Sequence, residues 1–323
     1  MTFKRRSLLA VSTLLLATAF GPASAQSYPN RPVVLVVPYA AGGNGDFTAR
    51  LFAEAFGKVI GQPVIVENRA GGGGAIGASF VTNAKPDGYT LLVAAKGVFS
   101  VTPNIVKTSY TIGDFTPISF ISRTPLVLVT RKSSKFASLE ALSAAAAAEP
   151  GKVPFGISAT GSDNHVATLR LEQAIGRSFV PIAYKGSGPM LQDLLGGQIE
   201  VGIDQLTTSK PYIESGDFKV LAVLGDSSEP LLAAAPTLEK LGVKPFAGET
   251  ALGVLGPRGL PTAIVQALEV ATRKALEDPK LIASLQKSGA ATYTGKRGEY
   301  ESDVKAESDF VQQMVAAGKI QRD

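Results

Sequence analysis

A repeated pattern of short apolar strand, glycine-rich loop and amphipathic helix sets the fold class of this chain. The strands are expected at 33–37, 64–66 and 89–95, the glycine loops at 42–45 and 71–74, and the helices at 46–57 and 75–84. Strands that alternate with helices at this spacing form parallel βαβ units, and a strand buried on both faces is apolar throughout. The pattern therefore predicts an α/β fold with a mostly parallel sheet.

The pattern starts again further along the chain, which predicts a second α/β lobe. Its strands are expected at 126–130, 153–157, 180–184, 199–203 and 220–224, and the tail after them has helical apolar spacing at 262–277, 280–287 and 299–317. We expect the chain to enter the second lobe near Leu126 and to return near Leu224. The first lobe is then discontinuous, with residues 26–126 plus 224–323, and the second lobe holds residues 127–223.

Residues 1–25 have the three-part build of a secretory signal peptide. A basic start with three cations precedes an apolar stretch at 8–20, and 23–25 read Ala-Ser-Ala. An A-x-A sequence is a usual cleavage site, and an apolar stretch of this length is too short to span a bilayer. We therefore expect an exported protein that is cleaved after Ala25. The paired arginines leave export by the Sec or the twin-arginine route open.

The formal net charge of +5 does not indicate a nucleic-acid-binding surface. Three of the 32 Lys and Arg residues lie in the expected signal, which leaves 29 cations against 27 Asp and Glu residues. No later segment carries a basic cluster, whereas a nucleic-acid-binding surface needs one. We therefore expect a nearly neutral exported protein with no nucleic-acid partner.

The scarcity of two residue types excludes several kinds of site. The chain has no Cys, which removes thiol nucleophiles, iron–sulfur clusters and thiolate zinc sites. It has a single His, at position 165, so no site with several histidine ligands can form. We expect neither a metal nor a cofactor.

Glycine loops at the carboxyl ends of the strands are the candidate binding site. Ligands of open parallel sheets bind beyond these ends. Two such loops lie in the first lobe, and two more lie at 160–162 and 185–188 in the second. Glycine lets backbone N–H groups approach a ligand, and helix N-termini add unpaired donors and a positive dipole end. The four loops together predict an anion clamp between the lobes, although each glycine is also a common turn former.

Several side chains at these ends suit both a ligand contact and a structural role. They are Tyr39, Asp46, Lys96, His165, Tyr184, Lys185 and Asp204. The lysines could bind a ligand carboxylate or lie in solvent, and the tyrosines could line the cleft or pack in the core. The aspartates could accept a hydrogen bond from the ligand or cap a helix. The residues alone leave these alternatives open.

Enzyme motifs fit less well. The sequence Gly72–Gly77 satisfies the dinucleotide-binding pattern G-x-G-x-x-G, but the next strand ends at Ala95 and Lys96 without the acidic residue that pattern needs. Residues 156–160 miss the last glycine of the hydrolase pattern G-x-S-x-G. We therefore expect a protein that is not an enzyme.

An ordered set of short motifs makes the chain similar to a known family. The motifs are YPNRP at 28–32, VVPYAAGG at 36–43, GQPVIVENR at 61–69, PDGYTLL at 86–92, YKG at 184–186, DLLGGQI at 193–199 and APT at 235–237. Together they cover the whole mature chain, and it resembles the Bug-type substrate-binding proteins of tripartite tricarboxylate transporters.

The resemblance implies a periplasmic receptor with a two-lobed type II periplasmic-binding-protein fold, the Venus flytrap. Such a receptor captures a small organic acid, a carboxylate or dicarboxylate, in the cleft between its lobes and presents it to the membrane permease subunits of the transporter. We expect it to act as a monomer. A domain that passes ligand occupancy to a signalling partner, and less favourably an enzyme that acts on an organic acid, are the alternatives.

Carried onto this chain, the resemblance and the loops together give the expected ligand-binding residues. In the first lobe they are Tyr39, Ala41, Gly43, Asn44, Asp46, Gly72, Gly73, Gly74 and Lys96; in the second they are Ser158, Thr160, Ser162, His165, Tyr184, Lys185 and Asp204. Lys96 departs from the small polar residue more frequent in the family, and Gln205 replaces a frequent Asn. A second ligand carboxylate that reaches Lys96 is one hypothesis for this difference.

Overall fold

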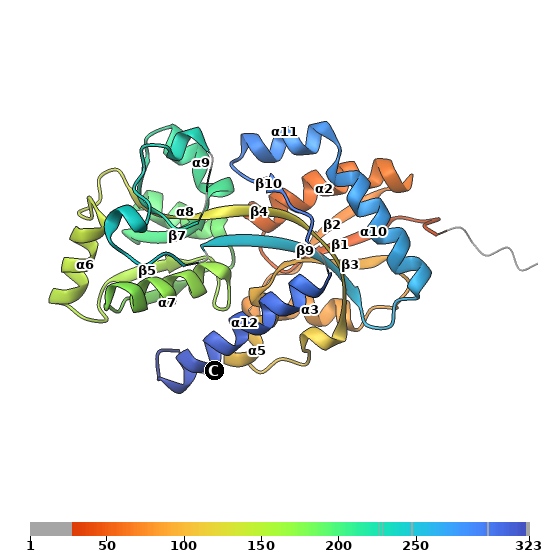
Figure 1. Ribbon diagram of the computed structural model, residues 1–323, viewed down its shortest axis with the longest axis horizontal. Coiled ribbons are helices and arrows are strands. Elements are labelled where there is room, and N and C mark those ends of the chain that lie inside the picture. The colour runs from red at the N-terminus through yellow and green to blue at the C-terminus, as the bar shows by residue number, and fades with distance from the viewer. Residues whose placement is uncertain (1–27, 226, 228, 247, 296, 321–323) are drawn as a thin grey trace, which may run out of the picture.

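The computed structural model describes residues 28–225, 227, 229–246, 248–295 and 297–320. The signal peptide expected at 1–25 lies outside these residues. Two α/β lobes lie side by side, each a sheet flanked by helices, and long strands run from one lobe into the other (Figure 1).

The sheet of the first lobe combines parallel strands with antiparallel ones. Its strands, in spatial order, are β2 (Val64–Asn68), β1 (Val33–Val37), β3 (Thr90–Ala95), β9 (Glu249–Pro257), the first part of β4 (Phe115–Arg131) and the short β10 (Ala291–Thr292). β1 pairs in parallel with β2 and β3, whereas β9 runs antiparallel to β3 and β4. The carboxyl ends of β1, β2 and β3 therefore lie at one edge.

The sheet of the second lobe repeats this arrangement. Its strands are β8 (Phe218–Val223), the second part of β4, β7 (Val201–Gln205), β5 (Pro154–Ile157) and β6 (Val180–Ala183). β5 pairs in parallel with β6 and β7, while β4 runs antiparallel to β7 and β8. The carboxyl ends of β5, β6 and β7 share an edge, so the expectation of mostly parallel strands holds for the strands that carry the loops.

A single strand belongs to both sheets. β4 pairs with β9 as far as Pro125 and with β7 from Leu126 onward. The sequence patterns predict only its second part, 126–130, and no strand at β9. Both strands are buried along nearly their whole length, but Ser, Thr, Pro and Gly interrupt the apolar run that marks a strand buried on both faces.

Helices cover both faces of the two sheets. They are α2 (Asn44–Ile60), α3 (Ala75–Thr82), α4 (Gly97–Ser100), α5 (Thr102–Ile105), α6 (Leu139–Ala148), α7 (Asp163–Ile175), α8 (Ser187–Gly196), α9 (Leu206–Glu214), α10 (Thr262–Leu276), α11 (Pro279–Lys287) and α12 (Arg297–Ala316). Ser138 and Ser162 cap α6 and α7 with side-chain oxygens. Glycines in the left-handed conformation end α2, α7 and α8, which is a common way to stop a helix.

Apolar side chains fill a core on each side of each sheet. Phe52 and Phe56 of α2 stack at 5.1 Å between ring centres beneath the first sheet. Phe155 of β5 lies at 4.8 Å from Phe179 in the second lobe. A further cluster joins the lobes, because Val166 of α7 packs in one apolar group with residues of α5 and α12.

The chain stays with the second lobe for longer than the expected return near Leu224. Leu232 and Leu238 pack into the cores of the second lobe, and Val223 forms a parallel bridge with Thr237. The chain then enters β9 at Glu249. On this packing we propose that the first lobe resumes at about residue 248, while the entry to the second lobe remains proposed at 126/127.

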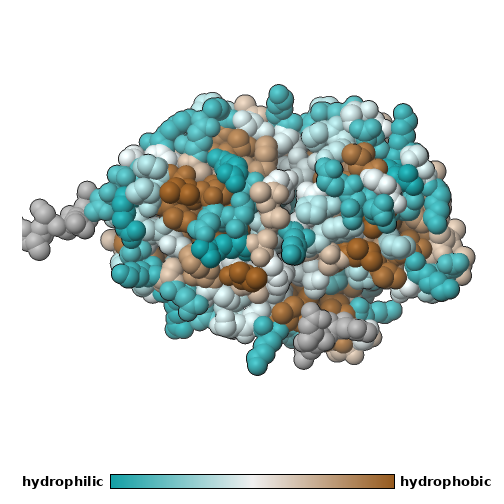
Figure 2. Space-filling model, turned by 180° about the vertical axis from the view of Figure 1, so that it is seen from behind, coloured by the Kyte–Doolittle hydropathy of each residue, from teal (hydrophilic) through white to brown (hydrophobic). Residues whose placement is uncertain are grey.

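The surface is mixed, without a continuous apolar belt on the face shown. Figure 2 shows separate brown patches divided by hydrophilic residues. The large hydrophobic side chains that are exposed among the described residues are Phe47, Val59, Ile65, Ile76, Phe80, Leu195 and Val270. No helix in the described part of the chain has the length and apolar character needed to cross a bilayer.

The core of the second lobe gives a first prediction. We expect Phe155→Ala to lower the free energy of unfolding by about 3–5 kcal/mol, because a fully buried ring that packs on Phe179 leaves a cavity. Urea unfolding followed by far-UV circular dichroism measures this loss. The control Ile76→Ala removes an exposed side chain and should change stability by less than about 0.5 kcal/mol. Equal effects of the two changes would contradict the assignment of Phe155 to the core.

Candidate functional site

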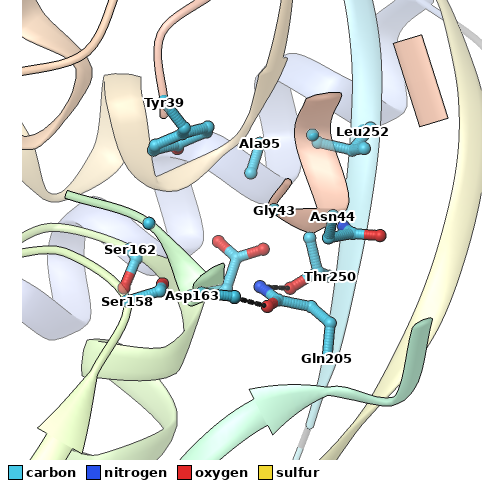
Figure 3. Close-up of a pocket in the computed structure, with 13 residues that line it drawn as sticks. Tyr39, Gly43, Asn44, Ala95, Ser158, Ser162, Asp163, Gln205, Thr250 and Leu252 are labelled. Carbon is cyan, nitrogen blue, oxygen red and sulfur yellow. Dashed lines mark hydrogen bonds between the residues drawn. The ribbon is translucent and has the colours of Figure 1, made fainter. Parts of the chain in front are cut away.

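A cavity lies where the carboxyl edges of the two sheets face each other. The closed lobes leave little space in it, about 30 Å³, which is room for about two water molecules. The first lobe lines it with Tyr39, Gly43, Asn44, Gly45, Ala95, Thr250 and Leu252, and the second lobe lines it with Ser158, Ser162, Asp163, Gly186, Ser187 and Gln205 (Figure 3). The expected residues Tyr39, Gly43, Asn44, Ser158 and Ser162 are therefore brought together.

Hydrogen bonds join the two walls of the cavity. The Ala40 N–H donates to the carbonyl oxygen of Lys185 at 3.0 Å. The Thr207 hydroxyl donates to Asn44 Oδ1 at 2.8 Å, and Gln205 Nε2 donates to Thr250 Oγ1 at 3.3 Å. Because each bond connects one lobe to the other, the structure is a closed form.

Glycines allow the backbones of the two lobes to approach so closely. A Cβ added at Gly97 would overlap the carbonyl oxygen of Gly161, and one added at Gly73 would overlap that of Thr160. The backbone nitrogen of Ser187 lies 3.6 Å from the Cβ position of Gly43. The glycine loops thus meet across the cleft, as their positions at the strand ends predict.

The helix that follows the first glycine loop begins at the cavity without a side-chain cap. Gly43 occupies the N-cap position of α2 and offers no side-chain acceptor. The first intrahelical bond of the ladder runs from the Phe47 N–H to the Gly43 carbonyl, so the N–H groups of 44–46 have no partner within the helix. This buried first turn faces the cavity with free donors and the positive end of the helix dipole.

Asp46 lies in this turn and is engaged by its own loop. Its Oδ2 accepts from the Gly42 N–H at 3.0 Å, and its Oδ1 lies 2.8 Å from Arg50. Burial raises the pKa of this carboxyl, but the bonds from Arg50 and Gly42 outweigh that effect and hold the pKa below its usual value. The helix-cap role left open for Asp46 is wrong, because Gly43 is the N-cap of α2; the carboxylate instead braces the loop through the Gly42 N–H.

The second glycine loop shapes the first lobe without lining the cavity. Gly72, Gly73 and Gly74 form a short 3-10 turn with φ between +55° and +97°, a region that favours glycine. The Gly73 carbonyl accepts from the Thr102 hydroxyl at 2.9 Å. The loop therefore lies behind the cavity wall, against the second lobe at Thr160.

The loop before α7 is held by its own side chains. The Ser162 hydroxyl donates to the Ala159 carbonyl at 2.8 Å and accepts from the His165 N–H at 3.3 Å. His165 Nδ1 accepts from the Gly161 N–H at 3.3 Å. Burial lowers the pKa of His165 to about 4, so its ring is neutral and acts as an acceptor within the loop.

Asp204 is enclosed by hydroxyl groups of the second lobe. Ser187 Oγ lies 2.5 Å from its Oδ1, while Thr208 and Ser209 donate to its Oδ2 at 2.6 and 2.7 Å. Burial raises the pKa of this carboxyl, and the three hydroxyls act in the opposite direction. Its carboxylate orients Ser187, which does line the cavity.

The remaining expected residues lie around the cavity rather than on its wall. Tyr184 donates to Asp193 at 2.8 Å, and the side chain of Lys185 is exposed. Lys96 Nζ lies 3.3 Å from Glu307 Oε2 and is only 18% exposed. Ala41 contributes a backbone oxygen close to Gly188 of the second lobe.

The second lobe also brings a helix N-terminus to the cavity. α8 begins after Gly186, which has no side-chain cap, and Gly186 and Ser187 both line the cavity. The N-termini of α2 and α8 therefore converge on one space from opposite lobes. The glycine loop expected at 185–188 contains both Gly186 and Ser187, although neither was named among the expected ligand-binding residues.

Five other cavity residues lie outside both the expected ligand-binding residues and the expected glycine loops: Ala95 at the end of β3, Asp163, Gln205, Thr250 and Leu252. Asp163 follows the predicted Ser162 directly, so its position was within reach of the sequence. Gln205 follows the predicted Asp204 at the end of β7. Thr250 and Leu252 come from β9, whose antiparallel direction brings its start, rather than its end, to the cleft. No motif marks that strand.

In the described ranges, no group of three His, Asp or Glu side chains is placed to hold a metal ion. The polar groups of the cavity are hydroxyls, amides, backbone N–H groups and one carboxylate. This donor set suits an anion with polar substituents better than a metal.

Comparisons with known proteins agree with this geometry. Residues 48–317 match the model of the tripartite tricarboxylate transporter family receptor. Protein BugT of Bordetella pertussis is 36% identical over 290 residues, which is 88% of each chain. MatC from Rhodopseudomonas palustris, solved with bound malate, is 28% identical, with a TM-score of 0.83 over 89% of this chain and 100% of MatC. Rpa4515 of R. palustris, solved with adipate, is 32% identical, with a TM-score of 0.84 over 92% and 100%.

These matches span about nine-tenths of the chain. The periplasmic binding protein BugD, 31% identical with a TM-score of 0.84 over 92% of this chain and 100% of BugD, confirms the two-lobed periplasmic-binding-protein fold that the motifs imply. The chain belongs to the tripartite tricarboxylate transporter receptor family.

Proposed function

We propose that this receptor holds the carboxylate of a small organic acid between the N-termini of α2 and α8. The observation that carries the proposal is the meeting of two uncapped helix N-termini, one from each lobe, at a single buried cavity. Free N–H groups and the positive dipole end make such a terminus an anion site. Because the two termini come from different lobes, the same anion favours the closed form over an open one.

Such a clamp can bind a carboxylate with micromolar affinity without a cationic side chain in the cavity. A hydrogen bond to a charged group contributes about 1.5–3 kcal/mol net. A few of them reach roughly −8 kcal/mol, which corresponds to micromolar affinity. Uncharged donors also hold the anion without a buried ion pair, whose desolvation is costly.

The relatives support the class of ligand and its destination. Malate and adipate, bound in the two solved relatives, are both dicarboxylates. The receptor would collect such an acid in the periplasm and deliver it to the membrane permease subunits of its transporter, acting as a monomer after cleavage behind Ala25. The neutral donor set is compatible with capture of the acid without conversion.

The release of bound ligand tests this function. The protein purified from its native host is denatured, and the released small molecules are identified by mass spectrometry. We expect a carboxylic acid that then stabilises the ligand-free protein in a thermal-shift titration and returns unchanged. Consumption of the acid would indicate an enzyme, and absence of any stabilising acid in a carboxylate screen would overturn the proposal.

The first turn of α2 gives a second prediction. Asn44→Pro removes one N–H at the first position of α2, where an α-helix tolerates proline, whereas Asn44→Ala keeps the donor. Both changes also remove the acceptor of the Thr207 hydroxyl, so that loss is matched. We expect the proline variant to bind the acid about tenfold more weakly than the alanine variant in isothermal titration. Equal affinities would show that this turn does not donate to the ligand.

The close contact at Gly97 gives a third prediction. Its φ lies outside the left-handed region, so Gly97→Ala leaves the first lobe unstrained, but the new Cβ overlaps Gly161 of the second lobe in the closed form. We expect affinity to fall about tenfold or more, and ligand to cause a smaller decrease in radius of gyration in X-ray scattering. Gly196→Ala, with no atom within 4 Å of the added Cβ, is the control. Unchanged affinity of Gly97→Ala would refute closure around this contact.

A further inference from the structure

Asp163 places a carboxylate inside the cavity without a hydrogen-bond partner. It is the first residue of α7 and is 4% exposed. Figure 3 shows its carboxylate pointing into the space bordered by Tyr39, Ala95 and Thr250. Neither of its oxygens has a partner of hydrogen-bond geometry among the described residues.

The charges around Asp163 do not neutralise it. Lys96 is the cation that faces it, but Lys96 Nζ is paired at 3.3 Å with Glu307, which is itself 4% exposed. The positive charge of Lys96 is thus shared by two buried carboxylates, and Asp303 adds a further negative charge near Lys96. The cluster carries an excess negative charge when Asp163 is ionised.

The neutral donors nearby do not replace a cation. The Thr250 hydroxyl and the Gly97 N–H lie close enough to favour the ionised carboxyl, but outside hydrogen-bond geometry. The Gln205 amide nitrogen is already committed to Asn164 Oδ1 at 2.7 Å and to Thr250 at 3.3 Å. A buried ionised carboxylate without a partner is costly, so the closed form calls for a proton or a donor at this point.

We propose that Asp163 is a specificity residue that pairs with a protonated amine of the ligand, so that the preferred solute is an organic acid that also carries an ammonium group. This inference rests on the proposed function, in which the ligand carboxylate lies on the N-termini of α2 and α8. The helix N-termini then bind the carboxylate of the solute, and Asp163 binds its ammonium group. An ammonium group balances the excess negative charge, which a hydroxyl does not.

The protonation of Asp163 gives the pairing a pH signature. Burial and the neighbouring Glu307 raise the pKa of Asp163 to about 7, while Lys96 acts in the opposite direction. An ammonium ligand needs the ionised carboxylate, so its affinity rises as the pH increases from 6 to 8. An acid without a donor needs the protonated carboxyl, and its affinity falls over the same interval.

Lys96, Tyr39, Tyr300 and His165 act on or lie beside Asp163 without titrating between pH 6 and 8. Burial lowers the pKa of Lys96, but Glu307 and Asp163 outweigh it and raise that pKa above its usual value. The pKa values of Tyr39 and Tyr300 are raised, chiefly by burial. The pKa of His165, in the same turn as Asp163, is lowered to about 4.

The experiment compares acids that differ at a single carbon. Succinate, malate and aspartate carry hydrogen, hydroxyl and ammonium there, and propionate, lactate and alanine repeat the series with one carboxylate. Isothermal titration at pH 6, 7 and 8 measures each Kd for the wild type, Asp163→Asn and the control Asp309→Asn, whose side chain is an exposed acid on α12. Buffers of different ionisation enthalpy report the protons exchanged on binding.

In the wild type and in Asp309→Asn, we expect the ammonium acid of at least one series to bind about tenfold or more tightly than its unsubstituted partner at pH 8, with release of protons at pH 6–7. Asp163→Asn should abolish that preference, its pH dependence and the proton release, while the unsubstituted acid still binds.

Two results would overturn the inference. If the unsubstituted acid binds as tightly as the ammonium acid in the wild type, or if the preference survives in Asp163→Asn, the inference falls and the carboxylate receptor stands. If no acid of either series binds any variant, the proposed function fails, and the inference fails with it.

Discussion

Two peptide backbones can approach each other only where side chains do not separate them, and this constraint organises the cleft. Gly43, Gly97 and Gly186 lie where the lobes touch, and a Cβ at Gly97 would already intrude on the opposite backbone. Close approach brings the first turns of α2 and α8 into one cavity. The proposed anion site is therefore a product of closure, since neither lobe alone supplies both sets of donors.

The acidic residues near the proposed anion site differ in which groups stabilise their negative charge. Asp46 is balanced by Arg50 and a loop N–H, and Asp204 is surrounded by three hydroxyls. Each shapes a loop without presenting its charge to the cavity. Asp163 is the exception, because it lines the cavity and shares the charge of Lys96 with Glu307. In the proposed site, neutral donors bind the ligand carboxylate, and Asp163 is the charged group that distinguishes between solutes.

Much of the fold could be predicted from local patterns, and less of the site. Apolar runs located β1, β3 and β5 within a residue or so. β9 and the first part of β4 lack such a run, because Ser, Thr, Pro and Gly interrupt their apolar residues. Thr250 could not be placed without β9. Asp163 could not be predicted as a binding residue, because its carboxylate is buried only when the opposite lobe closes over it. The local sequence pattern contains no information about that burial.

The strand shared by both sheets has a mechanical consequence. β4 changes partner from β9 to β7 between Pro125 and Leu126, and the return path enters β9 at Glu249, opposite Pro125. Both crossings therefore lie at one level of the molecule. Rotation about a few backbone bonds there would swing the second sheet as a lever, so that small torsional changes at the pivot would become large displacements at the N-terminus of α8. We therefore expect ligand affinity to depend on the stiffness of the chain at Pro125 and Leu126, which do not line the cavity.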